Sequence, residues 1–551
     1  MQFKKKLFKK RHGRKRLKIL TAAGCIVIAA ASAAFYLLSQ EEKEDSQETG
    51  IQERISQISE IYTEEYQDSV KERIEKVKAS GDYTEEYMLI EPDPFGTNPL
   101  SLYVYFKTDG PARVSYCVSA EDEEIADFSA VPASEERASQ EHEFQVMGLV
   151  PGMTNTVTFT VAYEDGREET FEYIEEDVSI AGEEEIRLDT EEVIENADAQ
   201  LSDGLYVILG NDSDELDYMY YYDNDGILRG EIPLIGYRSH RLLFREGLMY
   251  YSISETKIAA MDSLGMVQEV YDLGDYELHH DYVFDAEGGL LILATDTQSN
   301  TVEDQVIRLD PQTGEITGIL DLRELFPDYM DNFVDADSEG LDWIHINTLQ
   351  YLGDETLILS SRETSSIIKI SGAFSEPEIE YMIGNSGFWE GTGYEELLLE
   401  KDEGSSAFPD TGGQHSVTYV EDDSLPEGQY YLYMFNNNFG ISESRDYDWT
   451  AVQGIETSME DGETSYYYKY LVDENEGTYQ LVQSFEVPFS AYVSSAQEKE
   501  GNIIIDSGMA GVFGEYDTDG NLIREYQMEL AKNYIYRVYK YDFSDFLTIM
   551  S

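Results

Sequence analysis

Tyr222-Asp223-Asn224-Asp225-Gly226 (YDNDG) is the kind of stretch that decides the fold of this 551-residue chain. Tyrosines and aliphatic residues stand on both sides of it, and Asp-Gly is a strong signal for a tight turn between two β-strands. Three similar turns are MDSLG (261–265), LDPQTG (309–314) and YDTDG (516–520). Where such turns are easily recognised, they recur about every 40 to 50 residues, the length of one blade of a β-propeller.

The region from residue 177 to the end is rich in strand patterns and holds about 375 residues, enough for six such blades. YDNDG and YDTDG also resemble calcium-binding loops. The residue six positions after each glycine is Ile232 or Tyr526, however, where a calcium loop needs Glu. The turns therefore favour an all-β fold, with a six-bladed β-propeller over 177–551 as its main domain.

Residues 86–176 alternate apolar and polar side chains with a period of two, which predicts a small β-sandwich. Clear strand patterns are LSLYVYFKT (100–108), RVSYCVSA (113–120) and TVTFTVAY (156–163), with a turn expected at Asp109-Gly110-Pro111. LVPG at 149–152 looks like a corner of a fibronectin-type sandwich, although Asn155 stands where that corner usually has Tyr. We expect this domain to act as a spacer or lid.

The N-terminus has the pattern of a membrane anchor. Residues 1–18 contain ten Lys and Arg and no acidic residue, and the next twenty carry no charge. Such a run suffices to cross a bilayer, and its basic flank predicts a cytoplasmic tail over 1–18 and a single-pass transmembrane helix over 19–39. Alternatives are a signal-peptidase site, ASA (31–33), and a lipoprotein site, AAGC (22–25). The apolar run continues beyond both, which favours the uncleaved anchor and an extracellular location for the rest.

The charge of the chain limits its partners. The formal net charge of −74 includes the ten positive charges of the tail, which leaves −84 on the remainder. Such a field repels nucleic acids and anionic membrane surfaces. Apart from Cys25 in the anchor, the only cysteine is Cys117, so the exported part can form no intrachain disulfide.

Residues 40–85 predict a polar linker followed by an amphipathic stalk helix. Apolar side chains recur there every three or four residues, as on one stripe of a helix. They are Ile51, Ile55, Ile58, Tyr62, Tyr66, Val70, Ile74 and Val77. A stalk, the coiled coil of a homodimer and a helix laid on the next domain all fit this pattern.

Four of the seven histidines fall in three strand-like stretches, LHHDYVFD (278–285), DWIHIN (342–347) and GGQHSVTYV (412–420). Each would begin a different blade, and the first strands of blades line the central channel. DWIHIN reads as a strand that places His345 and Asn347 on one face, either as a buried structural pair or as part of a site. Arg362 follows one strand later.

These stretches resemble the bacterial arylsulfate sulfotransferases, which transfer sulfate between phenols without a nucleotide sulfate donor. The resemblance runs from about residue 88 to the end and is carried by HHD (279–281), DWIHIN, SSRETSSIIKI (360–370) and GGQHS (412–416). It implies that His415 is the nucleophile and becomes transiently sulfated. It further implies that the side chains around the sulfuryl group and the phenolic oxygen are His280, His345, Arg362 and Asn347. His279 is the alternative to His280 at this site.

The resemblance implies a ping-pong reaction between an aryl sulfate donor and a phenol acceptor, with no cofactor and no metal. The absence of GxxxxGK[ST], CxxC and HExxH motifs agrees with it. Arg238 and Arg241 are candidates for a positive focus that attracts the anionic donor, although both could equally be surface residues. One alternative is a non-catalytic propeller that binds glycan or protein. Another is a metal-dependent hydrolase with His280, His345 and His415 as ligands.

Overall fold

A computed structural model describes residues 50–550, apart from 177, 193–199, 212–215, 217, 335–339, 403, 405–406 and 460–462. The predicted tail (1–18) and anchor (19–39) therefore lie outside the described residues. Among the helices that are described, none is both long enough and apolar enough to cross a bilayer. The chain divides into two compact units, residues 1–57 and 58–551, and the second contains every described strand.

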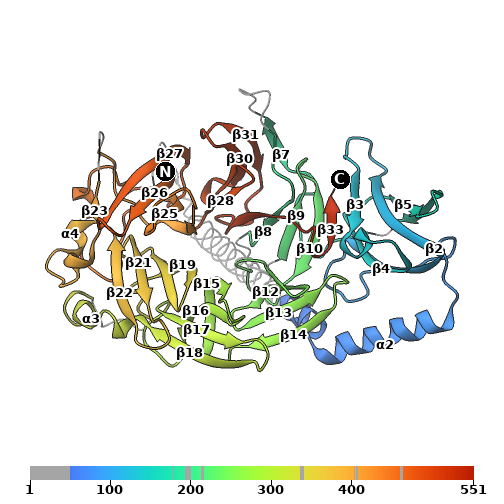
Figure 1. The fold of residues 1–551 in the computed structure, drawn as a ribbon, viewed down its shortest axis with the longest axis horizontal. Coiled ribbons are helices and arrows are strands. Elements are labelled where there is room, and N and C mark those ends of the chain that lie inside the picture. Colours follow the sequence, from blue (N-terminus) through green and yellow to red (C-terminus); the bar gives the residue numbers. More distant parts are fainter. Residues whose placement is uncertain are drawn as a thin grey trace, which may run out of the picture. The chain divides into compact units, whose positions relative to one another are not determined.

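Six sheets of four or five strands follow one another through residues 189–541 of the described chain (Figure 1). The first contains β8 (Leu205–Ile208), β9 (Tyr218–Tyr222), β10 (Leu228–Pro233) and β32 (Val538–Tyr541). The second contains β11 (Leu243–Arg245), β12 (Leu248–Ser254), β13 (Lys257–Asp262) and β14 (Val267–Asp272). The third contains β15 (Tyr276–Phe284), β16 (Leu290–Asp296), β17 (Gln305–Asp310) and β18 (Glu315–Asp321).

The remaining sheets repeat this plan. The fourth contains β19 (Ile346–Gly353), β20 (Thr356–Ser361), β21 (Ser366–Ser371) and β22 (Glu378–Ile383). The fifth contains β24 (His415–Val420), β25 (Gln429–Asn436), β26 (Thr464–Asp473) and β27 (Thr478–Pro488), with β23 (Glu400–Lys401) at its edge. The sixth contains β28 (Ser495–Lys499), β29 (Asn502–Ser507), β30 (Val512–Asp517) and β31 (Leu522–Gln527), joined by β7 (Asp189–Glu192). Short helices α3 (Pro327–Phe333) and α4 (Ser386–Trp389) flank the fourth sheet in sequence.

The beginning and the end of this region are joined, as in a ring of blades. β32, near the C-terminus, pairs with β8, and β7 pairs with β31. The edge strands β15, β19, β24, β28 and β32 each contact the next one in this order. The arrangement is β-propeller-like with these strands innermost, which agrees with the predicted all-β class.

The four turns from which the blades were predicted each join the third and fourth strands of a sheet, counted from the inside. In each turn the first Asp accepts a hydrogen bond from a backbone N–H two residues ahead, as Asp223 Oδ1 does from Asp225 at 2.9 Å. Gly226 ends the first turn with φ +71°, a left-handed conformation that glycine adopts without strain. The hairpin interpretation of these turns is confirmed.

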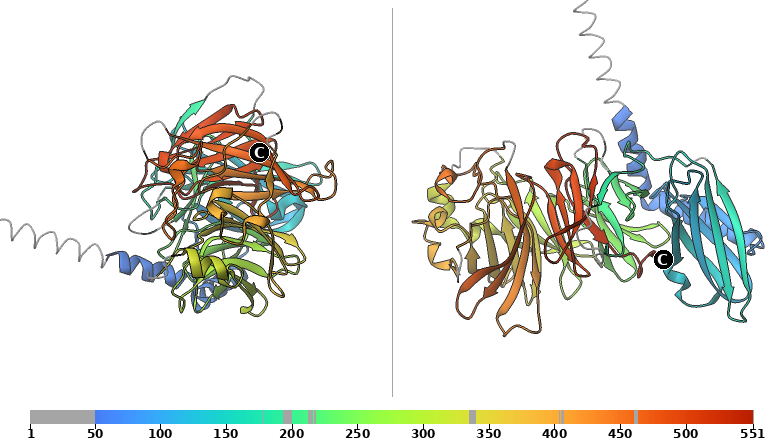
Figure 2. Two further views of the ribbon diagram at one scale, coloured as in Figure 1. Left: turned by 90° about the vertical axis from the view of Figure 1, so that its left-hand side faces the viewer. Right: turned by 90° about the horizontal axis from the view of Figure 1, so that it is seen from above.

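The sheet of residues 89–175 is folded around one long strand. β2 (Ser101–Ala120) runs without interruption through 109–111, so the turn predicted there is wrong. The strand changes partners at that point, which needs no reversal of the chain. Its first half pairs with β1 (Leu89–Pro92) and β4 (Ser139–Met147), and its second half pairs with β3 (Phe128–Pro132) and β5 (Asn155–Tyr163). β6 (Glu168–Glu175) and β33 (Thr548–Met550) complete the sheet, so the C-terminus lies beside this domain (Figure 2).

Asn155 builds the corner that the sequence suggested. Its Oδ1 accepts a hydrogen bond from Val150 N at 2.8 Å, and its Nδ2 donates to Val150 O at 2.8 Å and to Met153 O at 3.0 Å. The buried amide thus satisfies three backbone groups of the turn at once. Asn155 does at this corner what a tyrosine hydroxyl does in related sandwiches.

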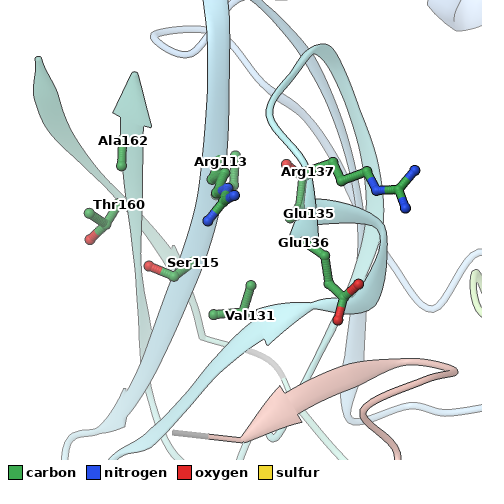
Figure 3. Close-up of a pocket in the computed structure, with 9 residues that line it drawn as sticks. Arg113, Ser115, Val131, Glu135, Glu136, Arg137, Thr160 and Ala162 are labelled. Carbon is green, nitrogen blue, oxygen red and sulfur yellow. The ribbon is translucent and has the colours of Figure 1, made fainter. Parts of the chain in front are cut away.

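An open pocket of about 500 Å³ lies on the folded sheet, between β2, β3, β5 and the segment 135–137 (Figure 3). Arg113 and Arg137 stand at it together with Glu135 and Glu136. None of the histidines discussed as site residues lines this pocket.

Helix α2 (Glu64–Ser80) packs on the folded sheet. Thr63 Oγ1 accepts from Tyr66 N at 3.3 Å and caps the helix, so the one helix predicted over 51–78 is interrupted there. The buried cluster at this contact includes Val70, Ile74, Leu89, Phe95, Tyr103, Tyr105 and Met266. Of the three placements left open, α2 adopts the one against the neighbouring domain.

Candidate active site

Three consecutive inner strands carry the histidines singled out in the sequence. His279 and His280 lie within β15, His345 directly precedes β19, and His415 is the first residue of β24. His345 is half-buried and the other three are buried. The centroids of the His280 and His345 rings are 4.9 Å apart, so two sheets contribute to one cluster.

A left-handed residue breaks the alternation of each of these strands. The φ angle is +52° at His280, +48° at His345 and +54° at Ser416, a region that residues with side chains rarely adopt. The pairing register shifts across His280 and across Ser416, which makes β-bulges there, and it shifts just after His345, between Ile346 and Thr348. Because bulges re-aim side chains beside active sites, the repeated bulge explains how imidazoles of successive sheets come together.

The interpretation of DWIHIN as a single strand is wrong. β19 begins only at Ile346, and the left-handed conformation of His345, with the register shift that follows it, ends the alternation that placed His345 and Asn347 on one face. The Asn347 side chain is fully buried, and its Nδ2 donates to the backbone carbonyl of Gln414 at 2.8 Å. Asn347 therefore ties the start of β19 to the residue that precedes His415.

Trp343 and Ile344 enter the hydrophobic core instead of forming a strand. The Trp343 indole N–H donates to Asp304 Oδ2 at 2.8 Å, which fixes the segment on the third sheet. With these two side chains directed into the core, Asp342 and His345 remain at its half-buried edge.

The hairpin between β20 and β21 connects the segments of His345 and His415. Arg362 N donates to His345 O at 3.0 Å, and Gln414 Nε2 donates to Ser361 O at 3.1 Å. The Arg362 guanidinium donates through Nη2 to Asp342 Oδ2 at 3.4 Å, and its buried Nε has no partner among the described residues. The predicted anion-binding arginine is therefore present beside His345 with a donor available.

Two carboxylates face His345 Nδ1. Glu303 Oε2 lies 2.7 Å from this nitrogen and Asp342 Oδ2 lies 2.5 Å from it. Burial lowers the pKa of His345, but the two carboxylates outweigh burial and raise it to about 9. Glu303 lies before β17 in the third sheet, so a charge from one blade holds the imidazole of the next as a cation.

His415 has the opposite electrostatic environment. Its Nδ1 donates to Gly413 O at 2.9 Å and to Asn437 Oδ1 at 2.7 Å. Burial lowers the pKa of His415 to about 3, and the nearby Arg537 cation adds to that decrease. The ring is therefore neutral near pH 7, with its proton on Nδ1 and its lone pair on Nε2.

Arg537 is a buried cation that contacts two of the strands of the site. It is 1% exposed, its Nη1 donates to His280 O, and its Nη2 donates to Asn347 O at 2.7 Å. One guanidinium thus holds the backbone of two of the three bulged strands. A planar group with several fixed donors suits this bridging role.

His279 and His280 both enter the cluster, with their Nδ1 atoms 3.1 Å apart. Burial lowers the pKa of each, so both rings are neutral near pH 7. Of the two, His280 lies nearer to the Glu303 carboxylate, with its Nδ1 3.8 Å from Glu303 Oε2. His240, which the sequence did not single out, is also buried here and bonds through Nδ1 to the Tyr536 hydroxyl at 3.1 Å.

Sequence reasoning missed several residues that control the histidines, namely Glu303, Asp342, Asn437, Arg537 and Tyr536. Asp342 stood inside the quoted DWIHIN stretch, and Asn437 lies in the unusual run FNNNFG (435–440). Arg537 and Lys540 interrupt the aromatic run YIYRVYKY (534–541), where a charge within a strand pattern is a usable signal. No local pattern marked Glu303.

Two overlapping sets of side chains in the described part of the chain have ligand atoms close enough to hold a metal ion. They are His279, His280 and Glu303, and Glu303, Asp342 and His345. His415 belongs to neither set, so these differ from the three-histidine set considered from the sequence. Arg362 Nη2, at 3.4 Å from Asp342, opposes a cation in the second set.

Two family models match the chain. Residues 190–537 match the family described as "Arylsulfotransferase (ASST)", and residues 89–177 match the "Arylsulfotransferase Ig-like domain". Similar solved structures include a protein of unknown function from Bacteroides caccae (9% identity, 61% of this chain and 98% of that chain, TM-score 0.37). Others are a WD40 domain of Toxoplasma gondii coronin (10%, 62% and 76%, 0.30) and BamB from Moraxella catarrhalis (8%, 66% and 96%, 0.30).

No curated protein matches the chain. The two family matches together cover most of its length. They include every histidine of the cluster and exclude the basic tail. Membership of this family supports an arylsulfotransferase activity in general terms. The chain belongs to the arylsulfotransferase family.

Proposed function

We propose that this protein transfers a sulfuryl group from an aryl sulfate to a phenol by a ping-pong reaction through a sulfated His415, without a nucleotide sulfate donor. The observation that carries the proposal is the contrast between two buried imidazoles. His415 is held neutral with a free Nε2, and His345 is held as a cation by Glu303 and Asp342. A nucleophile and a proton donor are the two groups that such a transfer needs.

In the first half-reaction, His415 Nε2 attacks sulfur and the bond from sulfur to the phenolic oxygen breaks. His345 gives its Nε2 proton to the departing phenoxide, which leaves as a neutral phenol. The new N–S bond places positive charge on the His415 ring, and the acceptors at Nδ1, Gly413 O and Asn437 Oδ1, stabilise that charge. Because a pKa of about 9 at His345 is close to that of a phenol, the proton can pass in either direction.

In the second half-reaction, the acceptor phenol returns a proton to His345 while its oxygen attacks sulfur, and the N–S bond breaks. Arg362 and His280, which both lie next to His345, face the peripheral sulfuryl oxygens in this scheme. Sulfuryl transfer resembles phosphoryl transfer in having a loose transition state with charge on those oxygens. Fixed cationic and N–H donors stabilise such charge.

Intact-mass measurement after brief exposure to 4-nitrophenyl sulfate alone tests the proposal. We expect the protein to gain one SO₃, to lose it on addition of phenol, and to carry it on His415 in peptide maps. His415→Ala should show no gain and no turnover. Sulfation at another residue, or transfer by the His415→Ala variant, would contradict the assignment.

A metal-dependent hydrolase is the second candidate, because Glu303 shares two possible ligand sets with the histidines. A chelator distinguishes the two functions. Sulfuryl transfer by the proposed route persists after metal is removed, whereas a hydrolase with a metal in either set loses its activity and regains it on addition of that metal.

We also propose that residues 19–39 anchor the protein as a single-pass helix with the catalytic part extracellular. The uncharged run and its basic flank in the sequence support this. Protease added to intact cells should cleave the catalytic part, and the N-terminal fragment should stay with the membrane after alkaline extraction. Recovery of the full chain in the soluble fraction would overturn the proposal.

A further inference from the structure

Arg238 is a half-buried cation without a carboxylate partner. Its Nη1 donates to the Tyr534 hydroxyl at 3.1 Å, its buried Nε has no partner, and no Asp or Glu of the described chain forms an ion pair with it. The chain has 112 acidic and 38 basic residues, so acids are plentiful. A partly desolvated cation that lacks an anionic partner lowers stability, and a bound anion would offset that cost.

Other shielded arginines of the propeller region do find acceptors inside the protein. Each of the following faces an Asp: Arg229, Arg241, Arg308, Arg323 and Arg362. Arg445 and Arg537 lack a carboxylate but donate to backbone carbonyls. Arg238 differs from both groups, because its one hydrogen bond goes to a tyrosine hydroxyl.

The surroundings of Arg238 are aromatic. Its guanidinium carbon lies 4.0 Å from the centre of the Tyr536 ring, 5.0 Å from that of Tyr237 and 5.9 Å from that of Tyr534. Cation–π contacts of this kind hold a guanidinium in place without neutralising its charge. The group is therefore positioned and still positive.

Arg238 is also next to the histidine cluster. The Tyr536 ring that it contacts lies 6.3 Å from the His280 ring. Burial raises the pKa of Tyr237, Arg238 opposes this, and Glu303 adds to the increase. The Tyr237 side chain is therefore within electrostatic range of both Arg238 and Glu303, the carboxylate that faces His345.

We propose that Arg238, framed by Tyr237, Tyr534 and Tyr536, binds a second negative group on the acceptor phenol. The inference rests on the proposed sulfuryl transfer and extends it to a substrate class: phenols that carry a carboxylate on the far side of the ring. The phenolic oxygen meets His345, and the carboxylate meets Arg238. Such a subsite also explains how a strongly acidic protein accepts an anionic substrate, because one uncompensated cation focuses the local field.

The test compares two acceptors with the full-length protein and a fixed concentration of 4-nitrophenyl sulfate. One acceptor is 4-hydroxyphenylacetate and the other is its neutral methyl ester. We expect Arg238→Gln to lower kcat/KM for the acid about tenfold, which corresponds to about 1.4 kcal/mol, and to change that for the ester less than about twofold. Arg238→Lys should retain part of the preference, and added salt should weaken it in the wild type.

Arg308→Gln is the matched control, because it removes one positive charge at a position paired with Asp285. It should leave the ratio of the two acceptors unchanged. An equal ratio in wild type and Arg238→Gln, or an equal loss in Arg238→Gln and Arg308→Gln, would overturn the subsite. If the wild type transfers sulfate to neither acceptor nor to phenol, the proposed function fails instead.

Discussion

The Glu303 carboxylate and the His345 imidazole belong to different blades, and their Oε2 and Nδ1 atoms lie 2.7 Å apart. Burial alone would raise the pKa of Glu303, but the His345 cation lowers it. Each group thus stabilises the charged form of the other in a site from which water is largely excluded. This contact keeps His345 protonated near neutral pH, although burial alone lowers the pKa of an imidazole.

The pH dependence of the first half-reaction should report this pair. Because the pKa of His345 is raised to about 9, its cation is present below that pH and is lost as the pH rises through it. We expect kcat/KM for the aryl sulfate to fall above about pH 9. Glu303→Gln should move this fall to lower pH. A profile that Glu303→Gln leaves unchanged would show that Glu303 does not control the proton donor.

Asn437 should fix the reactive form of His415. Its Nδ2 donates to Ser490 O at 2.8 Å and Val493 O at 3.1 Å, so its Oδ1 must face His415 Nδ1. Asn437→Ala removes one acceptor from the charged ring of the intermediate, and we expect the rate of His415 sulfation to fall about 10- to 100-fold.

Rapid-quench measurement of the SO₃ adduct separates this effect from substrate binding. The donor concentration at half-maximal rate should change little in Asn437→Ala, because Asn437 contacts the nucleophile. Asn437→Asp keeps an acceptor toward His415 but places a second oxygen against two carbonyls. A sulfation rate in Asn437→Ala equal to that of the wild type would refute the role.

Asn347 should act through the backbone. Its amide donates to Gln414 O, beside His415, so Asn347→Ala frees the start of β24. We expect about a 10- to 100-fold loss of rate, the cost of leaving one buried acceptor lone pair unpaired beside the nucleophile, with sulfation still detected on His415. The His415→Ala variant should show none. Equal residual activity in the two variants would break this assignment.

The stability of the folded ring of blades should depend on the ion pair between Lys540 and Glu515. Their Nζ and Oε2 atoms are 2.9 Å apart and both side chains are fully buried; Lys540 lies in β32 and Glu515 in β30, so the pair joins the first sheet to the sixth. Lys540→Met leaves the carboxylate buried without its cation, which costs about 3–5 kcal/mol. Urea unfolding measures this loss. Lys540→Met combined with Glu515→Gln should recover part of it, whereas no recovery would show that the charge is not the cause.

Much of the fold can be read along the chain. Turn residues such as Asp223 and Gly226 act within a few residues, because an Asp side chain bonds to nearby N–H groups and a glycine tolerates positive φ. The strand-rich region, its repeated hairpins and the histidine-bearing inner strands follow from these local rules. The turn expected at 109–111 failed because partner switching within β2 depends on strands far away in the sequence.

The sequence by itself placed His280, His345 and His415 in or directly before the innermost strands of three successive sheets. The tertiary structure alone decided their chemistry. A carboxylate 42 positions before His345 and an amide 22 positions after His415 set the charge of the two rings. Electrostatic interactions act through space and strengthen as water is excluded. Contacts between residues far apart in the sequence therefore cannot be predicted from a local pattern.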